Sequence, residues 1–126
     1  MEHVITLRQN EGVQVNPDRL EDLYRQLGES GAEDVVCRAL EELAARLSHT
    51  ERCFRELRYN DMRKSARSLV AIAEQIGMSL LAQVALDVTK CIDAGDRIAL
   101  SATMARLLRI GERSLTKIWE LQDLSI

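Results

Sequence analysis

The chain has 126 residues, 46% of them apolar and 3% aromatic, and a formal net charge of −3. This length suits one domain with one core. Mild acidity and scarce aromatic side chains argue against a nucleic-acid partner, and no apolar run approaches the roughly 20 residues of a membrane span. With one proline and many strong helix formers, the composition favours an all-α fold.

Residues 1–15 form a leader that we expect to be flexible, with β-like runs at Val4–Leu7 and Val13–Val15 that have no evident pairing partner. Asn16 and Pro17 predict a sharp helix start, with Asn16 as the N-cap. This first helix runs to about Leu27, and Gly28 stops it. Its apolar stripe consists of Leu20, Leu23, Tyr24 and Leu27.

A long second helix opens at Ser30 or Gly31 and runs to about Arg58. Apolar positions recur along it at alternating steps of four and three, which is typical of a bundle seam: Val36, Leu40, Leu43, Leu47, Thr50, Phe54 and Leu57. Asn60 or Asp61 caps a third helix that reaches about Ile76 and ends at Gly77. Its inward positions are Met62, Ala66, Leu69, Ala73 and Ile76.

Ser79 is expected to cap a fourth helix that ends at Ala94 before Gly95, and Asp96 to cap a fifth that runs to about Asp123. The inward positions are Leu81, Val84, Val88 and Cys91, then Leu100, Met104, Leu107, Leu108, Gly111, Leu115 and Ile118. Because the connections are short, sequential helices should pack antiparallel. The prediction is one domain over residues 16–126, an up-down-up-down four-helix bundle with an additional short N-terminal helix.

One stretch of the third predicted helix has the outline of a signalling motif. The run Ala66-Arg67-Ser68-Leu69-Val70-Ala71 is followed by Gly77, with Asp61 upstream and the turn Ala94-Gly95-Asp96 downstream. Over roughly residues 18–121 this layout resembles the histidine-containing phosphotransfer (HPt) family, whose motif is approximately Ala-His-x-Leu-Lys-Gly with a later glycine. The resemblance implies a cytoplasmic protein of two-component signalling that needs no cofactor.

The centre of the motif departs from that family. Arg67 stands where the family has its phospho-acceptor histidine, Val70 where it has a supporting lysine, and Ala71 where it has a small docking glycine. A guanidinium stays protonated and has no lone pair for attack on phosphorus, whereas imidazole titrates near 6.5. The resemblance therefore implies a pseudo-phosphotransfer protein, not an enzyme, that binds partners without carrying phosphate at this site.

Helical spacing places several residues on one outward side of the third helix, which we call the docking face: Arg63, Lys64, Arg67, Val70, Ala71 and Glu74. Arg67 could pair with the acidic pocket of a response-regulator receiver domain, or contact a histidine kinase. The alternative is a solvated helix face supported by intrahelical pairs such as Arg67 with Glu74.

His3 lies in the leader without catalytic neighbours, which leaves His49 as the other histidine. It follows Leu47 and Ser48 at a position rotated away from the seam, where it should be exposed. An active phosphotransfer protein that uses His49 is one alternative to docking. The other is a structural or adaptor helical bundle unrelated to phosphorelay.

Cys37, Cys53 and Cys91 lack metal-binding or redox spacing and are expected to be reduced, buried thiols. With two isolated histidines, no metal site is expected. Two interpretations are open for Trp119, Leu121, Leu124 and Ile126: they pack against the first helix, or they form an apolar patch that contacts a partner or a second copy in a homodimer.

Overall fold

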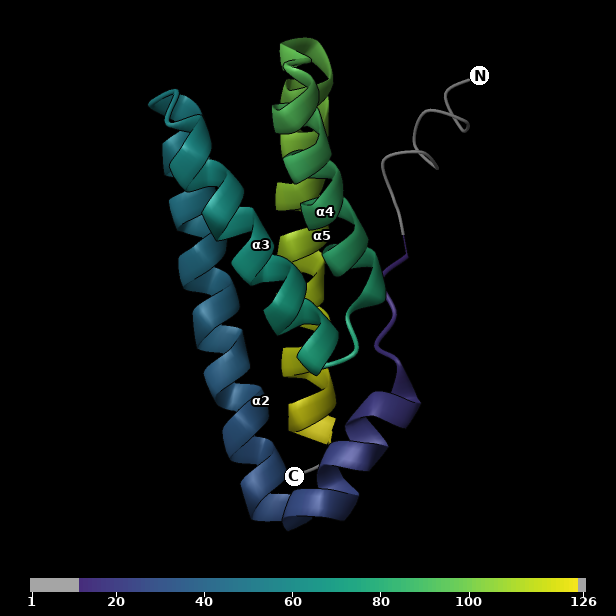
Figure 1. The fold of residues 1–126 in the computed structure, drawn as a ribbon. Coiled ribbons are helices and arrows are strands. Elements are labelled where there is room, and N and C mark those ends of the chain that lie inside the picture. The colour runs from purple at the N-terminus through teal and green to yellow at the C-terminus, as the bar shows by residue number, and fades with distance from the viewer. Residues whose placement is uncertain (1–11, 125–126) are drawn as a thin grey trace, which may run out of the picture.

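The computed structural model describes residues 12–124, with side chains described as far as residue 120. This part of the chain is all-helical and contains no strand, which confirms the predicted fold class. Figure 1 shows its four helices as a bundle: α2 (Pro17–Arg55), α3 (Tyr59–Gln75), α4 (Ser79–Ala94) and α5 (Arg97–Leu124). The leader residues 1–11, including His3 and Val4–Leu7, lie outside the described residues.

The start of α2 follows the predicted capping chemistry. Asn16 is the N-cap, its side-chain oxygen accepts a hydrogen bond from the backbone N–H of Asp18 at 3.0 Å, and Pro17 is the first helical residue. The expected stop at Gly28 is an interruption within α2: Gly28 has φ 75° and ψ 175°, outside helical values, and the chain bends sharply there (Figure 1). Only glycine adopts such a conformation without a steric penalty.

The C-terminal end of α2 lies earlier in the chain than the apolar pattern predicted. The helix ends at Arg55, and the chain reverses through hydrogen bonds from the N–H of Leu57 to the carbonyl of Phe54 (3.2 Å) and from the N–H of Arg58 to the carbonyl of Cys53 (2.8 Å). Leu57 takes the left-handed conformation with φ 59° and is 64% exposed. The prediction that Leu57 belongs to the core is wrong because the chain has left the helix before reaching it.

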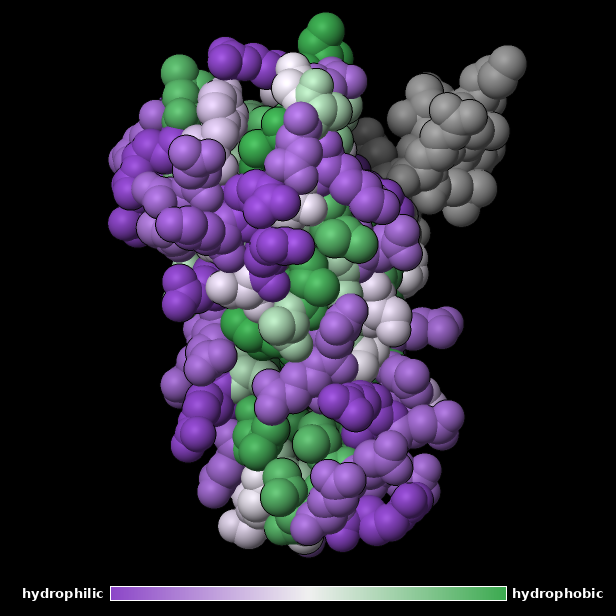
Figure 2. Space-filling view, in the orientation of Figure 1, coloured by the Kyte–Doolittle hydropathy of each residue, from purple (hydrophilic) through white to green (hydrophobic). Residues whose placement is uncertain are grey.

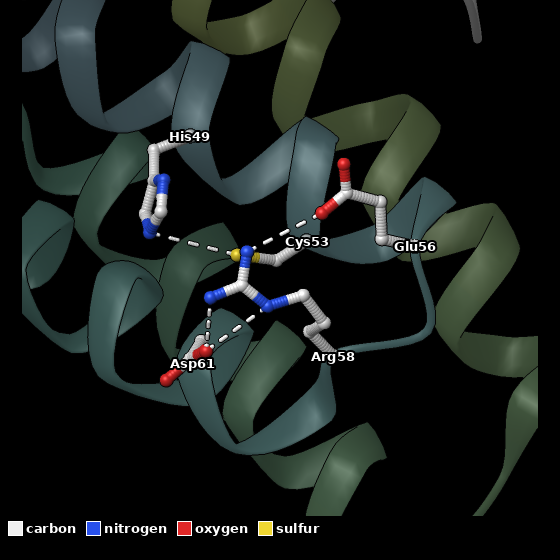
Figure 3. A network of polar contacts seen from close by, with 5 residues as sticks. All are labelled: His49, Cys53, Glu56, Arg58 and Asp61. Atoms are coloured by element: carbon white, nitrogen blue, oxygen red, sulfur yellow. Dashed lines mark hydrogen bonds and ion pairs between the residues drawn. The ribbon is translucent and has the colours of Figure 1, made fainter.

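An arginine holds the next turn together. The guanidinium of Arg58 donates to the carboxylates of Glu56, at 3.3 Å, and Asp61, at 3.1 Å from Nε (Figure 3). These hydrogen bonds raise the pKa of Arg58, with that to Asp61 the larger cause. Because α3 already begins at Tyr59, the predicted cap at Asn60 or Asp61 is wrong; Asp61 lies inside the first turn.

The remaining turns use the expected glycines. Gly77 and Gly95 both have positive φ, 78° and 67°. The side chain of Asp96 accepts a hydrogen bond from the backbone N–H three residues on, at 3.0 Å, as predicted for a cap. The predicted cap at Ser79 is wrong, since Ser79 is the first helical residue of α4 and the residue before it offers no capping side chain.

The helices pack in a closed order around one core. Consecutive helices contact each other, α5 contacts α2, and no diagonal pair packs among the described residues. The docking face on α3 and the α2–α5 seam therefore lie on different sides of the bundle. All five predicted inward positions of α3 are buried, and the largest fully buried side chains of the bundle are Leu43, Met62, Leu69, Ile76, Met78, Leu81, Met104, Leu107, Ile110, Ile118, Val84 and Val88.

The outer surface is largely polar. Figure 2 shows polar side chains over most of one face, with apolar ones gathered in a band down its middle. Val13 and Val15, which had β-like character in the sequence, pack against the edge of the core and form no strand. None of the described helices combines the length and the apolar content that crossing a membrane requires.

Candidate functional site

The predicted docking face lies on the side of α3 that turns away from the core. Lys64, Arg67, Ala71 and Glu74 are exposed there, whereas Arg63 and Val70 are half-buried. This division follows from the helix period, because the buried positions of α3 recur every three or four residues on its other side.

Arg63 is committed to a contact with α4. Its Nε donates to Oδ1 of Asp93 at 2.8 Å and its second terminal nitrogen donates to Oδ2 at 3.2 Å, which makes a two-pronged ion pair. These hydrogen bonds hold the pKa of the Asp93 carboxyl below its ordinary 3.8 against the opposing effect of desolvation, and the charge of Arg67 acts in the same direction. Arg63 therefore joins α3 to α4.

Arg67 is one of two cations that this face presents to solvent. It lies near the middle of α3, is exposed, and its guanidinium forms no hydrogen bond or ion pair with another described residue. The pair with Glu74 that the sequence suggested is absent, because seven residues of helix separate the two by about 10.5 Å along the axis. Arg67 is thus open to a partner carboxylate.

The residues around Arg67 are mixed in polarity. Ala71, one turn further along α3, is exposed, and Val70 packs against the edge of the core. Lys64, one turn back, adds a second exposed cation. An exposed helix face of this kind suits contact with another protein better than enclosure of a small molecule.

His49 is placed differently from the prediction. It is half-buried, and its Nε2 lies 3.6 Å from the sulfur of Cys53, which is fully buried (Figure 3). The prediction of an exposed histidine is wrong because α2 also packs on α3 along this side, which buries Thr50 and Cys53 next to His49. The ring is therefore only partly accessible from solvent.

A buried polar contact near His49 was not anticipated. The hydroxyl of Thr50 donates to the carbonyl of Arg46 at 2.7 Å and lies 2.7 Å from the hydroxyl of Ser65 on α3. The Ser65 hydroxyl is also 3.2 Å from the same carbonyl. This cluster satisfies the hydrogen bonding of both hydroxyls and joins α2 to α3.

The three cysteines form no disulfide with one another and have different environments. Cys53 is buried and Cys91 half-buried, but Cys37 is exposed, so the expectation that all three are buried is wrong for Cys37. It lies on α2, one turn before the half-buried Leu40. Among the described side chains, no three His, Cys, Asp or Glu residues converge as a metal site requires.

Trp119 is 62% exposed on α5 and lines a surface hollow with Cys37 and Leu40 of α2. The residues of α2 that line this hollow all follow the kink at Gly28. None of them belongs to residues 17–27, the first predicted helix, against which the sequence suggested that Trp119 packs. The side chains of Leu121, Leu124 and Ile126 lie outside the described residues.

Comparisons with protein-family models, curated proteins and solved structures find no match for this chain.

Proposed function

We propose that this protein is an HPt-like, cytoplasmic signalling bundle that docks a response-regulator receiver domain or a histidine kinase through the docking face, without carrying phosphate there. The observation that carries the proposal is the exposed guanidinium of Arg67 near the middle of α3, which makes no ion pair or hydrogen bond with any residue that the structure describes. The same proposal includes the up-down-up-down order of the helices, with residues 17–27 as the additional N-terminal helix.

The chemistry of Arg67 supports binding and not transfer. Its guanidinium is cationic at all physiological pH values and lacks the lone pair that a phospho-acceptor uses. It can, however, donate two parallel hydrogen bonds to a carboxylate. A receiver domain presents an acidic pocket around its phospho-accepting aspartate, which is a matching target for a protruding cation. The protein would act as a non-enzymatic partner that sequesters or blocks such a domain.

Neighbouring residues support this role by fixing the position of the face. The Arg63–Asp93 ion pair joins α3 to α4, and the Thr50–Ser65 contact joins α3 to α2, so the helix that carries Arg67 is held on both sides. A rigidly held surface loses less conformational entropy on binding than a mobile one. Lys64 adds positive potential that would speed association with an acidic partner.

The test is binding of purified receiver domains from the same genome, each in its phosphorylated and unphosphorylated state, to wild type and to Arg67→Glu. One charge-assisted contact contributes about 1.5–3 kcal/mol, so reversal of the charge should weaken binding by about tenfold or more. Arg109→Glu is the matched control, since Arg109 is an exposed arginine on α5. If no receiver binds, or both variants lose affinity equally, the proposal is wrong.

The alternative of phosphate transfer through His49 has a separate test. A receiver domain charged with labelled phosphate would be mixed with wild type and with His49→Ala. Label that appears on the wild type only would establish transfer at His49. The half-buried ring beside Cys53 argues against this outcome.

A further inference from the structure

The bundle is hollowed on its α2–α5 side, away from the docking face. Two adjoining cavities of about 510 and 270 Å³ lie between these helices and share Ala44 and Leu115, so they form one continuous groove. We call this the α2–α5 groove. Its lining consists of Cys37, Leu40, Glu41, Ala44, Leu47, Ser48 and Glu51 from α2 and Leu108, Glu112, Leu115, Thr116 and Trp119 from α5.

The lining of this groove is mainly apolar. Four leucines, two from each helix, lie along it, and Trp119, the single tryptophan of the chain, adds a largely exposed ring. A large exposed aromatic side chain beside several leucines is typical of surfaces that contact another molecule.

The charged residues that line these two cavities are acidic, whereas a neighbouring cavity that shares Glu112 and Thr116 with them is also lined by Arg113 and Lys117. Glu41, Glu51 and Glu112 contribute carboxylates, and no lysine or arginine lines either cavity of the groove. Glu51 is 3.7 Å from Arg55, but the Arg55 side chain is 67% exposed and that of Glu51 41% exposed, so solvent screens this pair and it neutralises little of the negative potential. The groove therefore presents apolar contacts together with acidic groups.

We infer that the α2–α5 groove binds an amphipathic helix of a partner protein, with an apolar stripe flanked by lysine or arginine. An apolar stripe would lie along the leucines and Trp119, and the flanking cations would face the three glutamates. From Cys37 to Glu51 the groove extends about 21 Å along α2, which corresponds to about 14 residues of a bound helix.

The charge pattern favours this occupant over two others. A symmetric contact with a second copy of the chain would bring the same acidic linings together. The chain's own leader, Met1–Glu11, contains Glu2 and Glu11 against Arg8 and so supplies too little positive charge. A basic helix from another protein is the occupant whose charge is complementary.

The experiment uses the full chain and a synthetic 18-residue helical peptide of leucine, lysine and glutamine, with leucines on one side and lysines beside them. A matched peptide replaces every lysine by glutamate and keeps the leucines. Trp119 reports binding directly, because covering its exposed ring should shift its emission to the blue. We expect the affinity for the lysine peptide to be at least about tenfold higher than that for the glutamate peptide. The affinity for the lysine peptide should also fall as salt is added.

Two neighbouring alanines of α2 supply the control variants. Ala44 is exposed and lines both cavities. Ala44→Arg should therefore fill the groove with a long cationic side chain and lower the affinity for the lysine peptide by about tenfold or more. Ala45 is also exposed but lines neither cavity, and Ala45→Arg should leave the affinity unchanged. Both substitutions place a strong helix former on the surface of α2 and leave the core intact.

Several results would overturn the proposal: no saturable shift of Trp119 emission, equal affinity for the two peptides, or equal loss in the two arginine variants. A dimer in sedimentation that Ala44→Arg alone dissociates would assign the groove to a second copy. A red shift of Trp119 emission on removal of residues 1–11 would assign it to the leader. The groove is separate from the docking face, so its test stands whether or not a receiver binds.

Discussion

The close approach of α5 to α2 at Gly111 gives the sharpest stability prediction. A Cβ atom added to Gly111 would lie 2.6 and 2.8 Å from the two terminal methyl carbons of Leu47 and 3.3 Å from its Cγ. Carbon atoms pack at about 3.5–4.0 Å, so the added methyl group would be about 1 Å too close. Leu47 is 7% exposed and lines the α2–α5 groove, so relief of the clash would move its side chain out of the core and into the groove.

Two opposing effects decide the outcome of Gly111→Ala. Alanine in place of glycine inside a helix stabilises by about 1 kcal/mol. Overpacking a well-filled core costs about 1–3 kcal/mol. We therefore expect Gly111→Ala to lower the free energy of unfolding by about 1 kcal/mol, measured as a lower urea midpoint with an unchanged slope.

The matched control is the same substitution after the clash has been removed. Leu47→Ala alone should cost about 2–5 kcal/mol because it leaves a cavity. In that background the methyl group of Gly111→Ala has space, and the substitution should stabilise by about 1 kcal/mol. The coupling between the two sites is then about 2 kcal/mol. If Gly111→Ala has the same effect in both backgrounds, α2 and α5 do not approach each other as described.

Three further predictions concern single contacts. Leu57→Gly should raise the free energy of unfolding by about 0.5–1 kcal/mol, because glycine adopts φ 59° freely and the leucine is mostly exposed. The readout is a higher urea midpoint, and a lower midpoint would contradict the left-handed conformation. Thr50→Val should lower the free energy of unfolding by about 1 kcal/mol. The double variant with Ser65→Ala should lose less than the sum of the two single losses, since both hydroxyls belong to one cluster; additive losses in the same unfolding series would refute this coupling. Arg63→Gln should return the pKa of Asp93 toward 3.8 in an NMR titration. Because the folded-state pKa of Asp93 is depressed, the stability lost in Arg63→Gln should be present at neutral pH and shrink as pH falls below 3.8, whereas a constant difference would exclude this pair as the cause.

Two helix starts were predictable from local chemistry in the sequence, whereas the caps predicted at Asn60 or Asp61 and at Ser79 were wrong. Asn16 with Pro17, and Gly95 with Asp96, act through hydrogen bonds and backbone angles within one turn, and each has its expected role. The end of α2 was not predictable, because Leu57 takes a left-handed conformation that normally indicates glycine.

The candidate site also has features that the sequence predicts and features that it does not. The exposure of Arg67 follows from the helix period, which the sequence shows directly. The pairing of Arg63 with Asp93 does not, because the two residues are 30 positions apart and meet only through the packing of α3 on α4. The exposure of His49 was predicted wrongly for a related reason. Its burial depends on the packing of α3 and not on the apolar pattern of its own helix.

The structure also separates what the motif contributes to folding from what it contributes to binding. Ala66 and Leu69 are fully buried. Gly77 has positive φ, its carbonyl accepts a hydrogen bond from the N–H of Asn16 at 2.9 Å, and a Cβ atom there would lie 3.1 Å from the Asn16 carbonyl oxygen. Packing alone requires these three residues, so their match to the family motif carries little weight for function.

Arg67 is the residue of the motif that the fold does not require. Its side chain is exposed and makes no ion pair with a described residue, so Arg67→Ala should leave the free energy of unfolding within about 0.5 kcal/mol of wild type. Urea unfolding of Arg67→Ala beside wild type measures this directly. A larger loss would mean that Arg67 serves stability, and weaker receiver binding by the Arg67 variants would then have a structural cause. An unchanged stability together with lost binding is the combination that only a docking role produces.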